Sequence, residues 1–311
     1  MTLRSAQGKP VGEALREGRR ILTNAGIEEA DLEAELLLRH ALGIDRADLF
    51  AHLDGGIDPD RRAAYQAFLA RRLAHEPTAY ITGRREFYGL DFQVTPAALI
   101  PRPETELLVD EALRIWASML EARSSKPEEA IPRLADVGTG SGAVAVALAV
   151  HLPEATIVAT DTSRDALLLA GRNARRHGVG DRIALVQTDL LAGLRPDADA
   201  RSGRPSGRPP FDLVVANLPY VPTAVWEALP PEIRDHEPRA ALDGGADGLS
   251  AIHRLLRAAP AYLTPGGALL LEIGADQGPA VLALARQALP GRTARILKDA
   301  TGRDRVLAVR R

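Results

Sequence analysis

The stretch "DLVVANLPYVPT" at residues 212–223 ends an apolar run on an amide, a proline and a phenol. The side-chain oxygen of Asn217 can accept one hydrogen of a planar –NH₂ group, and the backbone carbonyl of Leu218 can accept the other. Pro219 favours an extended Leu218, which aims that carbonyl, and Tyr220 offers a flat ring for packing on the acceptor group. This tetrapeptide, hereafter the amide clamp, predicts a catalytic and substrate-binding site that orients a carboxamide or an amine while it receives a group.

A second candidate site lies in "LADVGTGSGAVAVALA", where Gly138, Gly140 and Gly142 fall between an expected strand and an expected helix. Glycine permits a sharp turn and lets a ligand approach the backbone with no Cβ in the way. Asp161 ends the next expected strand, 23 residues after Gly138, and a carboxylate there can accept both hydroxyls of a ribose. Because Ala143 completes the pattern G-x-G-x-x-G/A, the loop alone fits NAD as well as S-adenosylmethionine (SAM).

Two observations favour SAM and a methyltransferase over NAD and an oxidoreductase. Asp136 precedes the glycines, where a carboxylate can meet the ammonium group of a methionine but would repel a pyrophosphate. Asn217 closes a strand at the same edge of the sheet, so the amide clamp should face the reactive end of the ligand. An oxidoreductase needs a proton donor and a nicotinamide slot, and it has no use for such a clamp. No general base is required, since the methylated product can lose its proton to water.

These sites need a framework, and strands alternate with helices after residue 133, which predicts a parallel α/β sheet. A closing antiparallel pair is expected at 294–311, a hairpin turning at Gly89 is expected in "REFYGLDFQVTP", and short helices are expected over residues 11–74. Asp58 and Pro59 should begin the last of those helices, and Thr105 is a candidate helix cap. The expected strands are 134–137, 156–160, 183–187, 213–216 and 268–273, and the expected helices are 143–151, 164–177, 250–262 and 278–288.

The composition disfavours or excludes several classes of function. The net charge is −2, which disfavours a protein that holds duplex nucleic acid directly. The chain has no cysteine, which excludes disulfides, thiolate metal sites and a cysteine nucleophile. It has no run of about eighteen apolar residues and no apolar leader, so we expect a cytoplasmic protein without a membrane partner. The stretches 121–133 and 195–210 are expected to be surface excursions, the second of them mobile.

With these features the sequence resembles the PrmC/HemK family of protein-glutamine N5-methyltransferases. The resemblance implies SAM as cofactor and, as substrate, the glutamine of the Gly-Gly-Gln loop in class I peptide chain release factors. It also implies a Rossmann-like seven-stranded methyltransferase domain at 104–311, an N-terminal helical substrate-recognition domain at 1–83 and a β-hairpin connector at 84–103. Four segments carry the likeness in the expected order: "IPRPETE" at 100–106, "DVGTGSG" at 136–142, "HEPRAALDGGADGL" at 236–249 and "LEIGADQ" at 271–277.

The resemblance also assigns residues to the site. Asp161 would bind the ribose of SAM, and Asp189 and Leu190, which follow the third strand of the sheet, would lie beside the adenine. Asn217 would reach both cofactor and substrate, and the rest of the amide clamp would hold the substrate. The other cofactor-binding residues that we expect are Asp136, Gly138, Thr139, Gly140, Ser141 and Gly142.

Some residues depart from the family pattern or have two interpretations. The family's usual tetrapeptide is Asn-Pro-Pro-Tyr, but position 218 contributes a main-chain carbonyl, so Leu218 should reduce preorganisation slightly without loss of activity. Arg102 and Glu104 either shape the cofactor pocket or form a salt bridge near the domain junction. His236 and Glu237 are expected to brace a loop, and no metal site is predicted.

Three rival functions stay open. Similar motifs serve methyltransferases that act on the exocyclic amine of adenine in DNA, which must extract a base and hold phosphates; the sequence shows no basic stripe and no separate target-recognition segment. A related enzyme methylates a glutamine of a large-subunit ribosomal protein, and the N-terminal helices with "IPRPETE" favour a release factor over it. A SAM-binding module without catalysis is disfavoured because Asn217 and Tyr220 are intact.

Overall fold

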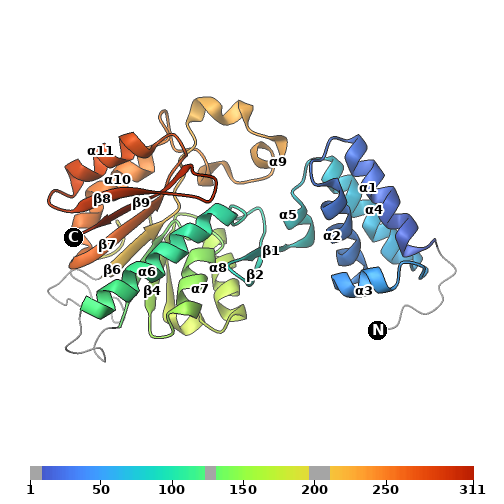
Figure 1. Ribbon diagram of the computed structural model, residues 1–311, viewed down its shortest axis with the longest axis horizontal. Helices are drawn as coiled ribbons and strands as arrows, with labels where there is room; N and C mark the ends of the chain where they lie inside the picture. The colour runs from blue at the N-terminus through green and yellow to red at the C-terminus, as the bar shows by residue number, and fades with distance from the viewer. Residues whose placement is uncertain (1–8, 123–130, 196–210) are drawn as a thin grey trace. The chain divides into compact units, whose positions relative to one another are not determined.

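The computed structural model describes residues 9–122, 131–195 and 211–311, and the chain divides by its contacts into two compact units (Figure 1). The helical unit comprises residues 1–84 and 230–236, and the sheet unit comprises residues 85–229 and 237–311. The surface excursions expected at 121–133 and 195–210 lie mostly outside the described residues. Within the described ranges, no helix is both long enough and apolar enough to cross a membrane.

The helical unit packs short amphipathic helices around a leucine-rich core. The side chain of Asp58 accepts hydrogen bonds from the backbone N–H groups of Asp60 and Arg61, which begins α4 where the sequence predicts. Gly43 adopts a left-handed conformation (φ 65°) directly after α2 and ends that helix. The helices are α1 Val11–Asn24, α2 Ala30–Leu42, α3 Arg46–Ala51, α4 Pro59–Leu73, α5 Thr78–Thr82 and α9 Pro231–Arg234.

Arg72 ties the segment 230–236 into the helical unit. Its side chain is almost fully buried between Glu33 of α2 and Glu232 of α9, and Nη2 lies 2.9 Å from Oε1 of Glu232. A buried guanidinium needs such partners, because removal of one leaves charge uncompensated inside the protein. The chain therefore leaves the sheet unit after residue 229 and returns to it at residue 237.

The predicted hairpin is present as β1 (Arg84–Phe87) and β2 (Leu90–Gln93). It turns at Tyr88 and Gly89, which both have positive φ (54° and 71°). Phe87 and Phe92 are buried in the same hydrophobic cluster as α6 (Glu106–Ala122) and α7 (Ala143–His151). The hairpin thus contributes core side chains to the sheet unit.

The central sheet has seven strands in the order β5-β4-β3-β6-β7-β9-β8. Strands β3 to β7 pair in parallel, and β8 and β9 close one edge in antiparallel fashion, as the sequence predicts. Strand β7 begins at Leu263 and not at residue 268, because Leu263 pairs with Phe211 across a register shift although "TPGG" is typical of a turn. The strands are β3 Arg133–Val137, β4 Thr156–Asp161, β5 Ile183–Gln187, β6 Phe211–Ala216, β7 Leu263–Glu272, β8 Thr293–Lys298 and β9 Asp304–Arg310.

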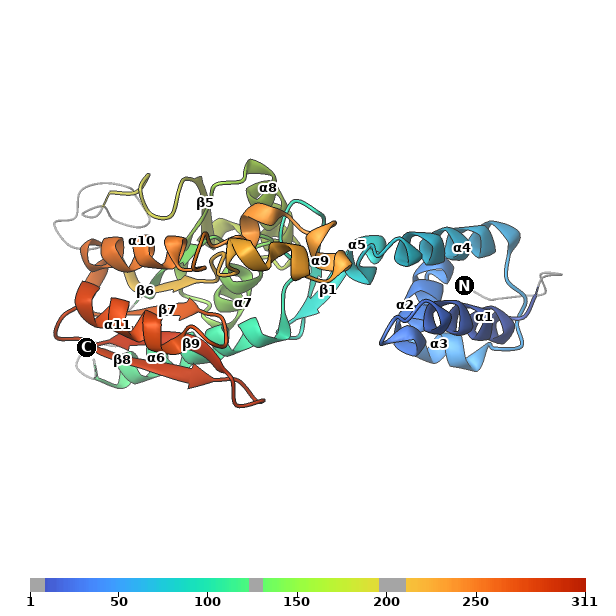
Figure 2. The same cartoon turned by 90° about the horizontal axis from the view of Figure 1, so that it is seen from above.

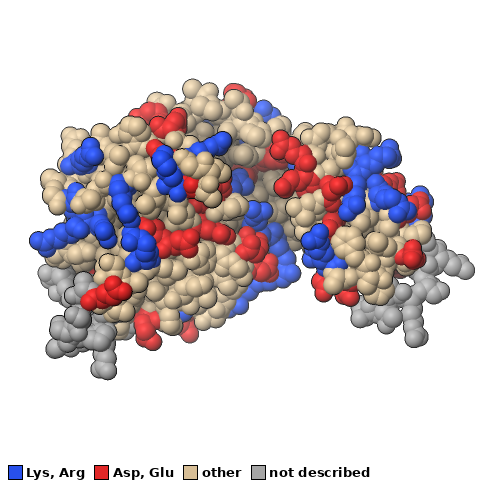
Figure 3. All heavy atoms as spheres, viewed as in Figure 1, with Lys and Arg blue, Asp and Glu red and all other residues tan. Residues whose placement is uncertain are grey.

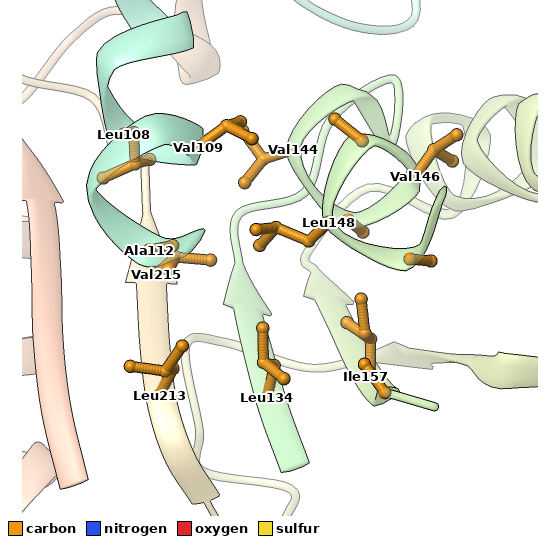
Figure 4. Close-up of a cluster of buried hydrophobic side chains, with 14 of the residues drawn as sticks. Leu108, Val109, Ala112, Leu134, Val144, Val146, Leu148, Ile157, Leu213 and Val215 are labelled. Atoms are coloured by element: carbon orange, nitrogen blue, oxygen red, sulfur yellow. The ribbon is translucent and has the colours of Figure 1, made fainter. Parts of the chain in front are cut away.

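Helices cover both faces of the sheet, as Figure 1 and Figure 2 show. Alternate strand residues point to opposite faces, so Leu134 and Leu213 pack under α6, α7 and α8 (Arg164–Arg176), as Figure 4 shows for α6 and α7. Ala135 and Val214 pack under α10 (Ser250–Ala258) and α11 (Gly278–Ala288). Burial on both faces explains the nearly continuous apolar character of β6. Helix α10 ends before the predicted residue 262, and a 3-10 turn containing Pro260 follows it.

The chain order places a topological switch point between β3 and β6. From β3 the chain builds β4 and β5 on one side, and it then continues with β6 on the other side. Ligands of open α/β sheets bind beyond the carboxyl ends of the strands at such a point. Gly138 follows β3, Asp161 ends β4 and Asn217 follows β6, so the fold gathers the predicted features at this edge.

Candidate functional site

A cavity of about 380 Å³ lies at this edge of the sheet unit. Pockets for small molecules and cofactors typically enclose roughly 300 to 1,000 Å³, so the cavity is large enough for a nucleoside ligand. Gly142 and Tyr220, which were also predicted as site residues, do not line the cavity: Gly142 packs against Ala170, and the Tyr220 hydroxyl donates to Glu272. The other predicted residues meet at the cavity: Asp136, Gly138, Thr139, Gly140, Ser141, Asp161, Asp189, Leu190, Asn217, Leu218 and Pro219.

The glycine loop has a shape that only glycine adopts without strain. Gly138, Gly140 and Gly142 have φ values of 77°, 54° and 81°. A Cβ on Gly142 would lie 2.9 Å from the Cβ of Ala170, so this glycine lets α7 and α8 approach each other. A Cβ on Gly138 would lie 3.0 Å from Cδ2 of Leu218. Gly142 therefore permits close packing of α7 against α8, and Gly138 permits close packing of the loop against Leu218 of the amide clamp.

Asp136 is buried and stabilises the loop that it precedes. Its Oδ2 accepts hydrogen bonds from Oγ1 of Thr139 (2.6 Å) and from the backbone N–H of Ala145 (3.1 Å). Burial raises the pKa of Asp136 to about 6; these two hydrogen bonds oppose the shift, and the charge of Asp161 adds to it. The carboxylate still lines the cavity, so it can present a negative charge there above about pH 6.

Asp161 is positioned by backbone groups on both sides. Its Oδ2 accepts from the N–H of Gly140 (2.9 Å), and its Oδ1 accepts from the N–H of Ser163 (2.8 Å). Ser163 in turn caps α8, because its hydroxyl accepts from the N–H of Ala166. An ionised carboxylate offers about four acceptor sites, so two of them are left for ligand hydroxyl groups.

Asp189 and Leu190 line the side of the cavity that follows β5. Leu190 has a positive φ of 52°, which is uncommon for a residue with a branched side chain. Oδ2 of Asp189 lies 2.5 Å from Nη2 of Arg254, a residue of α10 that also lines the cavity. Both side chains are about half exposed, so this pair orients Asp189 more than it stabilises the fold.

The amide clamp directly follows β6, and its asparagine is oriented by a threonine. Nδ2 of Asn217 donates to Oγ1 of Thr105 (3.1 Å), which leaves Oδ1 of Asn217 as an acceptor at the cavity. Thr105 was expected as a helix cap; it ends a 3-10 turn (Pro103–Thr105) just before α6, and its hydroxyl takes part in the site. The Tyr220 hydroxyl donates to Oε1 of Glu272 (3.3 Å), and burial raises the pKa of this phenol well above its usual value.

The segment 242–249 braces the main chain of the clamp, which gives a physical reason for its glycines. The N–H of Gly244 donates to the carbonyl of Val221 (2.8 Å). A Cβ on Gly248 would lie 2.2 Å from the carbonyl oxygen of Tyr220, so only glycine fits. That carbonyl also accepts from Nε2 of Gln277 (2.9 Å). Two of the segments that carry the family likeness, 236–249 and 271–277, therefore act on the clamp through its backbone.

Arg102 combines the two interpretations that the sequence left open for it. It lines the cavity, and it forms an ion pair with Glu237, whose side chain is only 1% exposed. Oε2 of Glu237 also accepts from the N–H of Ile100 (3.1 Å), so this carboxylate braces the segment before α6. Glu104 is exposed, and its negative charge contributes to the raised pKa of Tyr220.

Other parts of the cavity wall were not predicted as site residues from the sequence, although Ile100 and Pro101 belong to the segment "IPRPETE". Residues 97–101, between β2 and α6, line the cavity, and Arg254 lines it from α10. Asn173 of α8 is fully buried, and its Nδ2 donates to the carbonyls of Gln93 (3.0 Å) and Ser141 (2.8 Å). No local pattern marks these residues, because a polar side chain in an amphipathic helix usually faces water.

Comparisons with known proteins found family matches for both units of the chain. Residues 13–83 match the family described as PrmC N-terminal domain, and residues 106–221 match the family described as methyltransferase small domain. A release factor glutamine methyltransferase of Moorella thermoacetica is 44% identical over 312 residues, which cover 100% of this chain and 99% of the relative. Another of Geobacter sulfurreducens is 46% identical over 263 residues, which cover 85% of this chain and 84% of the relative.

The fold also occurs among solved structures. The hMettl16 catalytic domain in complex with the MAT2A 3'UTR hairpin 1 has a TM-score of 0.52 and 17% sequence identity, with coverage of 78% of this chain and 80% of that chain. At this identity the similarity concerns the fold alone. The relatives over the full length say more: the chain belongs to the family of release factor glutamine methyltransferases.

Proposed function

We propose that the protein transfers the methyl group of SAM to the side-chain amide nitrogen (N5) of the glutamine in the Gly-Gly-Gln loop of class I peptide chain release factors. The proposal rests on one observation. Nδ2 of Asn217 donates a hydrogen bond to Oγ1 of Thr105, so Oδ1 is left to accept an N–H at the cavity. This is the arrangement that a carboxamide substrate requires. The curated relatives named release factor glutamine methyltransferase support the choice of substrate.

The residues around the cavity fit SAM. Asp161 has two acceptor sites left for the ribose hydroxyls, and Asp136 offers a negative charge for the ammonium group. Asp189 and Leu190 would flank the adenine. The glycine loop, Gly138 to Gly142, admits the ligand close to the backbone. When bound, SAM supplies an electrophilic methyl group on a sulfonium centre.

The amide clamp would activate the acceptor by orientation. Oδ1 of Asn217 and the carbonyl oxygen of Leu218 each accept one N–H of the glutamine amide, which fixes its plane and offsets the positive charge that develops on nitrogen. Pro219 restricts Leu218 to extended conformations, and Tyr220 supports the end of the clamp through its hydrogen bond to Glu272. The methylated nitrogen then loses one proton to water, so no general base is assigned.

We also assign substrate recognition to residues 1–83, with residues 84–103 as connector and residues 104–311 as methyltransferase domain. The match of residues 13–83 to the PrmC N-terminal domain supports this division. The helical unit carries the exposed apolar side chains Leu32, Phe50 and Leu73, which we choose as probes of this assignment. Their replacement by serine should raise KM for a whole release factor and leave KM for a short Gly-Gly-Gln peptide unchanged.

The decisive experiment offers labelled SAM and several acceptors to the protein. We expect label in a class I release factor and none in the same factor with its Gly-Gly-Gln glutamine changed to alanine. Label in both factors would contradict the proposed site of methylation. Label only in DNA would favour an adenine methyltransferase, and label only in a large-subunit ribosomal protein would favour the other glutamine methyltransferase. The net charge of −2 favours a protein substrate over DNA, and the face that Figure 3 shows carries both basic and acidic side chains on the sheet unit.

A further inference from the structure

The carboxylate of SAM needs a partner at the cavity. SAM carries a positive sulfonium, a positive ammonium group and a negative carboxylate, and Asp136 can pair with the ammonium group, which leaves the carboxylate. A carboxylate that leaves water needs hydrogen-bond donors, and a guanidinium supplies two of them in the geometry that a carboxylate prefers. Among the described residues that line the cavity, Arg102 and Arg254 are the only basic ones. These two guanidinium groups are therefore the candidates.

The sheet order places these two arginines at opposite ends of the cavity. Neighbouring strands run in the order β5-β4-β3-β6, so the groups at their ends form a row: Asp189 after β5, Asp161 at the end of β4, the glycine loop after β3 and Asn217 after β6. Arg254 is paired with Asp189 at the β5 end of this row (2.5 Å). The methionine moiety must lie toward the β3 and β6 ends for its methyl group to face Asn217, so it lies away from Arg254.

Arg102 lies at the other end of the row, beside the amide clamp. Its carbonyl accepts from the N–H of Thr105 (3.1 Å), which closes the 3-10 turn before α6. The hydroxyl of Thr105 accepts in turn from Nδ2 of Asn217 (3.1 Å). Two hydrogen bonds thus connect Arg102 to the residue that faces the methyl group of SAM. The methionine moiety, whose sulfur carries that methyl group, should therefore lie within reach of the Arg102 side chain.

The guanidinium of Arg102 is oriented by a buried acid and still has donors for a ligand. Nη2 forms an ion pair with Oε1 of Glu237, whose side chain is 1% exposed, and Oε2 of Glu237 accepts from the N–H of Ile100 (3.1 Å). Among the described residues, Nη2 is the only nitrogen of the Arg102 side chain that has a hydrogen-bond partner. Because a guanidinium has five N–H donors in a rigid plane, most of them are left for a ligand in the cavity that Arg102 lines.

We propose that Arg102 binds the carboxylate of the methionine moiety of SAM. The inference rests on the proposed function, which supplies SAM as the ligand. The charges of the site suit this pairing. A free guanidinium would repel the sulfonium and the ammonium group, whereas the pair of Arg102 and Glu237 has no net charge and still presents N–H donors. Arg102 and Asp136 then recognise the carboxylate and the ammonium group separately, so the cavity selects a ligand with a complete amino-acid end.

The test compares two ligands that differ in one group. Decarboxylated SAM keeps the sulfonium and the ammonium group and lacks only the carboxylate. We expect the wild type to bind decarboxylated SAM about tenfold or more weakly than SAM, the scale of a charge-assisted hydrogen-bonded pair. Arg102→Met keeps the length of the side chain and removes its donors, so it should bind the two ligands with nearly the same Kd. Titration calorimetry without any release factor measures these Kd values.

Control variants and a third ligand separate loss of this pair from damage to the pocket. Asp136→Asn should weaken SAM and decarboxylated SAM by the same factor, because both ligands carry the ammonium group. Arg286→Met, which changes an exposed arginine of α11, should leave both Kd values unchanged. The third ligand, 5′-methylthioadenosine, lacks the whole amino-acid end, so Arg102→Met should bind it as tightly as the wild type does.

Three results would overturn the inference. Equal affinity of the wild type for SAM and decarboxylated SAM would do so without any variant that has to fold. A ratio of the two Kd values in Arg102→Met that matches the wild-type ratio would also do so, as would an equal loss of affinity for all three ligands. The proposed function fails separately: a protein that prefers SAM through Arg102 but methylates no release factor would keep this inference and defeat that function. A protein that binds no SAM would defeat both.

Discussion

Around the glycine loop the cavity wall is held by backbone groups and by the side chains of Asp136 and Asp161, which lie close to it in the sequence, whereas around the amide clamp it depends on side chains from distant segments. The N–H groups of Gly138 and Thr139 both donate to the carbonyl of Thr160 at 2.8 Å, and Gly140 donates to Asp161. The clamp is held by Thr105, Glu272 and Gln277, which lie far from it in the sequence.

This difference separates the effects that substitutions should have. A wall made of backbone in left-handed conformations has its shape fixed by glycine, so an added Cβ should change stability first. A wall made of side-chain hydrogen bonds keeps its fold when one polar group is removed, so the change should appear in turnover. The predictions below test this division from the largest expected effect to the smallest.

The largest effect on turnover should come from Asn217→Ala. Removal of the first amide acceptor should cut kcat by about a hundredfold or more, the size seen when one oriented polar group is lost from a catalytic site. Methyl transfer to a release factor measures the loss, and thermal unfolding should be nearly unchanged. Glu227→Ala, an exposed polar-to-alanine change ten residues further along, serves as the control. Near-normal turnover in Asn217→Ala would show that the clamp is assigned wrongly.

Gly142→Ala should have the largest effect on stability. The new Cβ would lie 2.9 Å from Cβ of Ala170 on a backbone with φ 81°, so strain and overlap should together cost about 2 to 4 kcal/mol of the free energy of unfolding. Gly178→Ala is a matched control, since Gly178 also has a positive φ (68°) but open space around it. The difference between the two variants in the free energy of unfolding, measured with denaturant, gives the cost of the steric overlap with Ala170 alone. Equal costs would mean that close approach of α7 and α8 does not require this glycine.

The two halves of the cavity also differ in what the sequence could predict. The glycine loop and Asp161 were predictable, because their roles follow from backbone geometry over a short stretch of chain. Most strands and helices were predictable for the same reason, since the periodicity of apolar residues is local. Strand β7 shows the limit: "TPGG" has the composition of a turn, but pairing with Phe211 extends the strand over it.

The supports of the clamp were not predictable from local pattern. Thr105 looked like a helix cap, and Glu272 lay in a segment noted only for its likeness to a family. Their functions depend on the ends of β6 and β7 and one 3-10 turn, segments that are far apart in the sequence. Arg254 and Asn173 were missed for the same reason.

A smaller effect, on the affinity for SAM, should come from loss of the negative charge of Asp136. Burial raises its pKa to about 6, so the carboxylate is ionised and able to pair with the ammonium group of SAM above that pH, and it becomes neutral below it. Kd for SAM should therefore rise about tenfold as the pH falls from 7 to 5. Asp136→Asn should bind SAM more weakly at pH 7 and show no such dependence, whereas Asp181→Asn, at an exposed site, should behave as the wild type. Equal pH profiles in Asp136→Asn and the wild type would assign the ammonium group to another residue.

The smallest effect on turnover should come from Leu218→Pro, which restores the family's usual tetrapeptide. Leu218 belongs to the amide clamp, and its side chain lies close to Gly138 of the glycine loop. The carbonyl at position 218 is present in both proteins, and Pro219 already restricts the backbone there, so kcat should change by no more than about threefold. The side chain, however, is 4% exposed and packs against Gly138, so its loss should cost about 1 to 2 kcal/mol of stability. Parallel measurements of kcat and unfolding test both parts. A large change in kcat with unchanged stability would mean that Leu218 acts on the substrate through its side chain. The amide clamp would then depend on a side-chain contact that the main-chain carbonyl of residue 218 cannot supply.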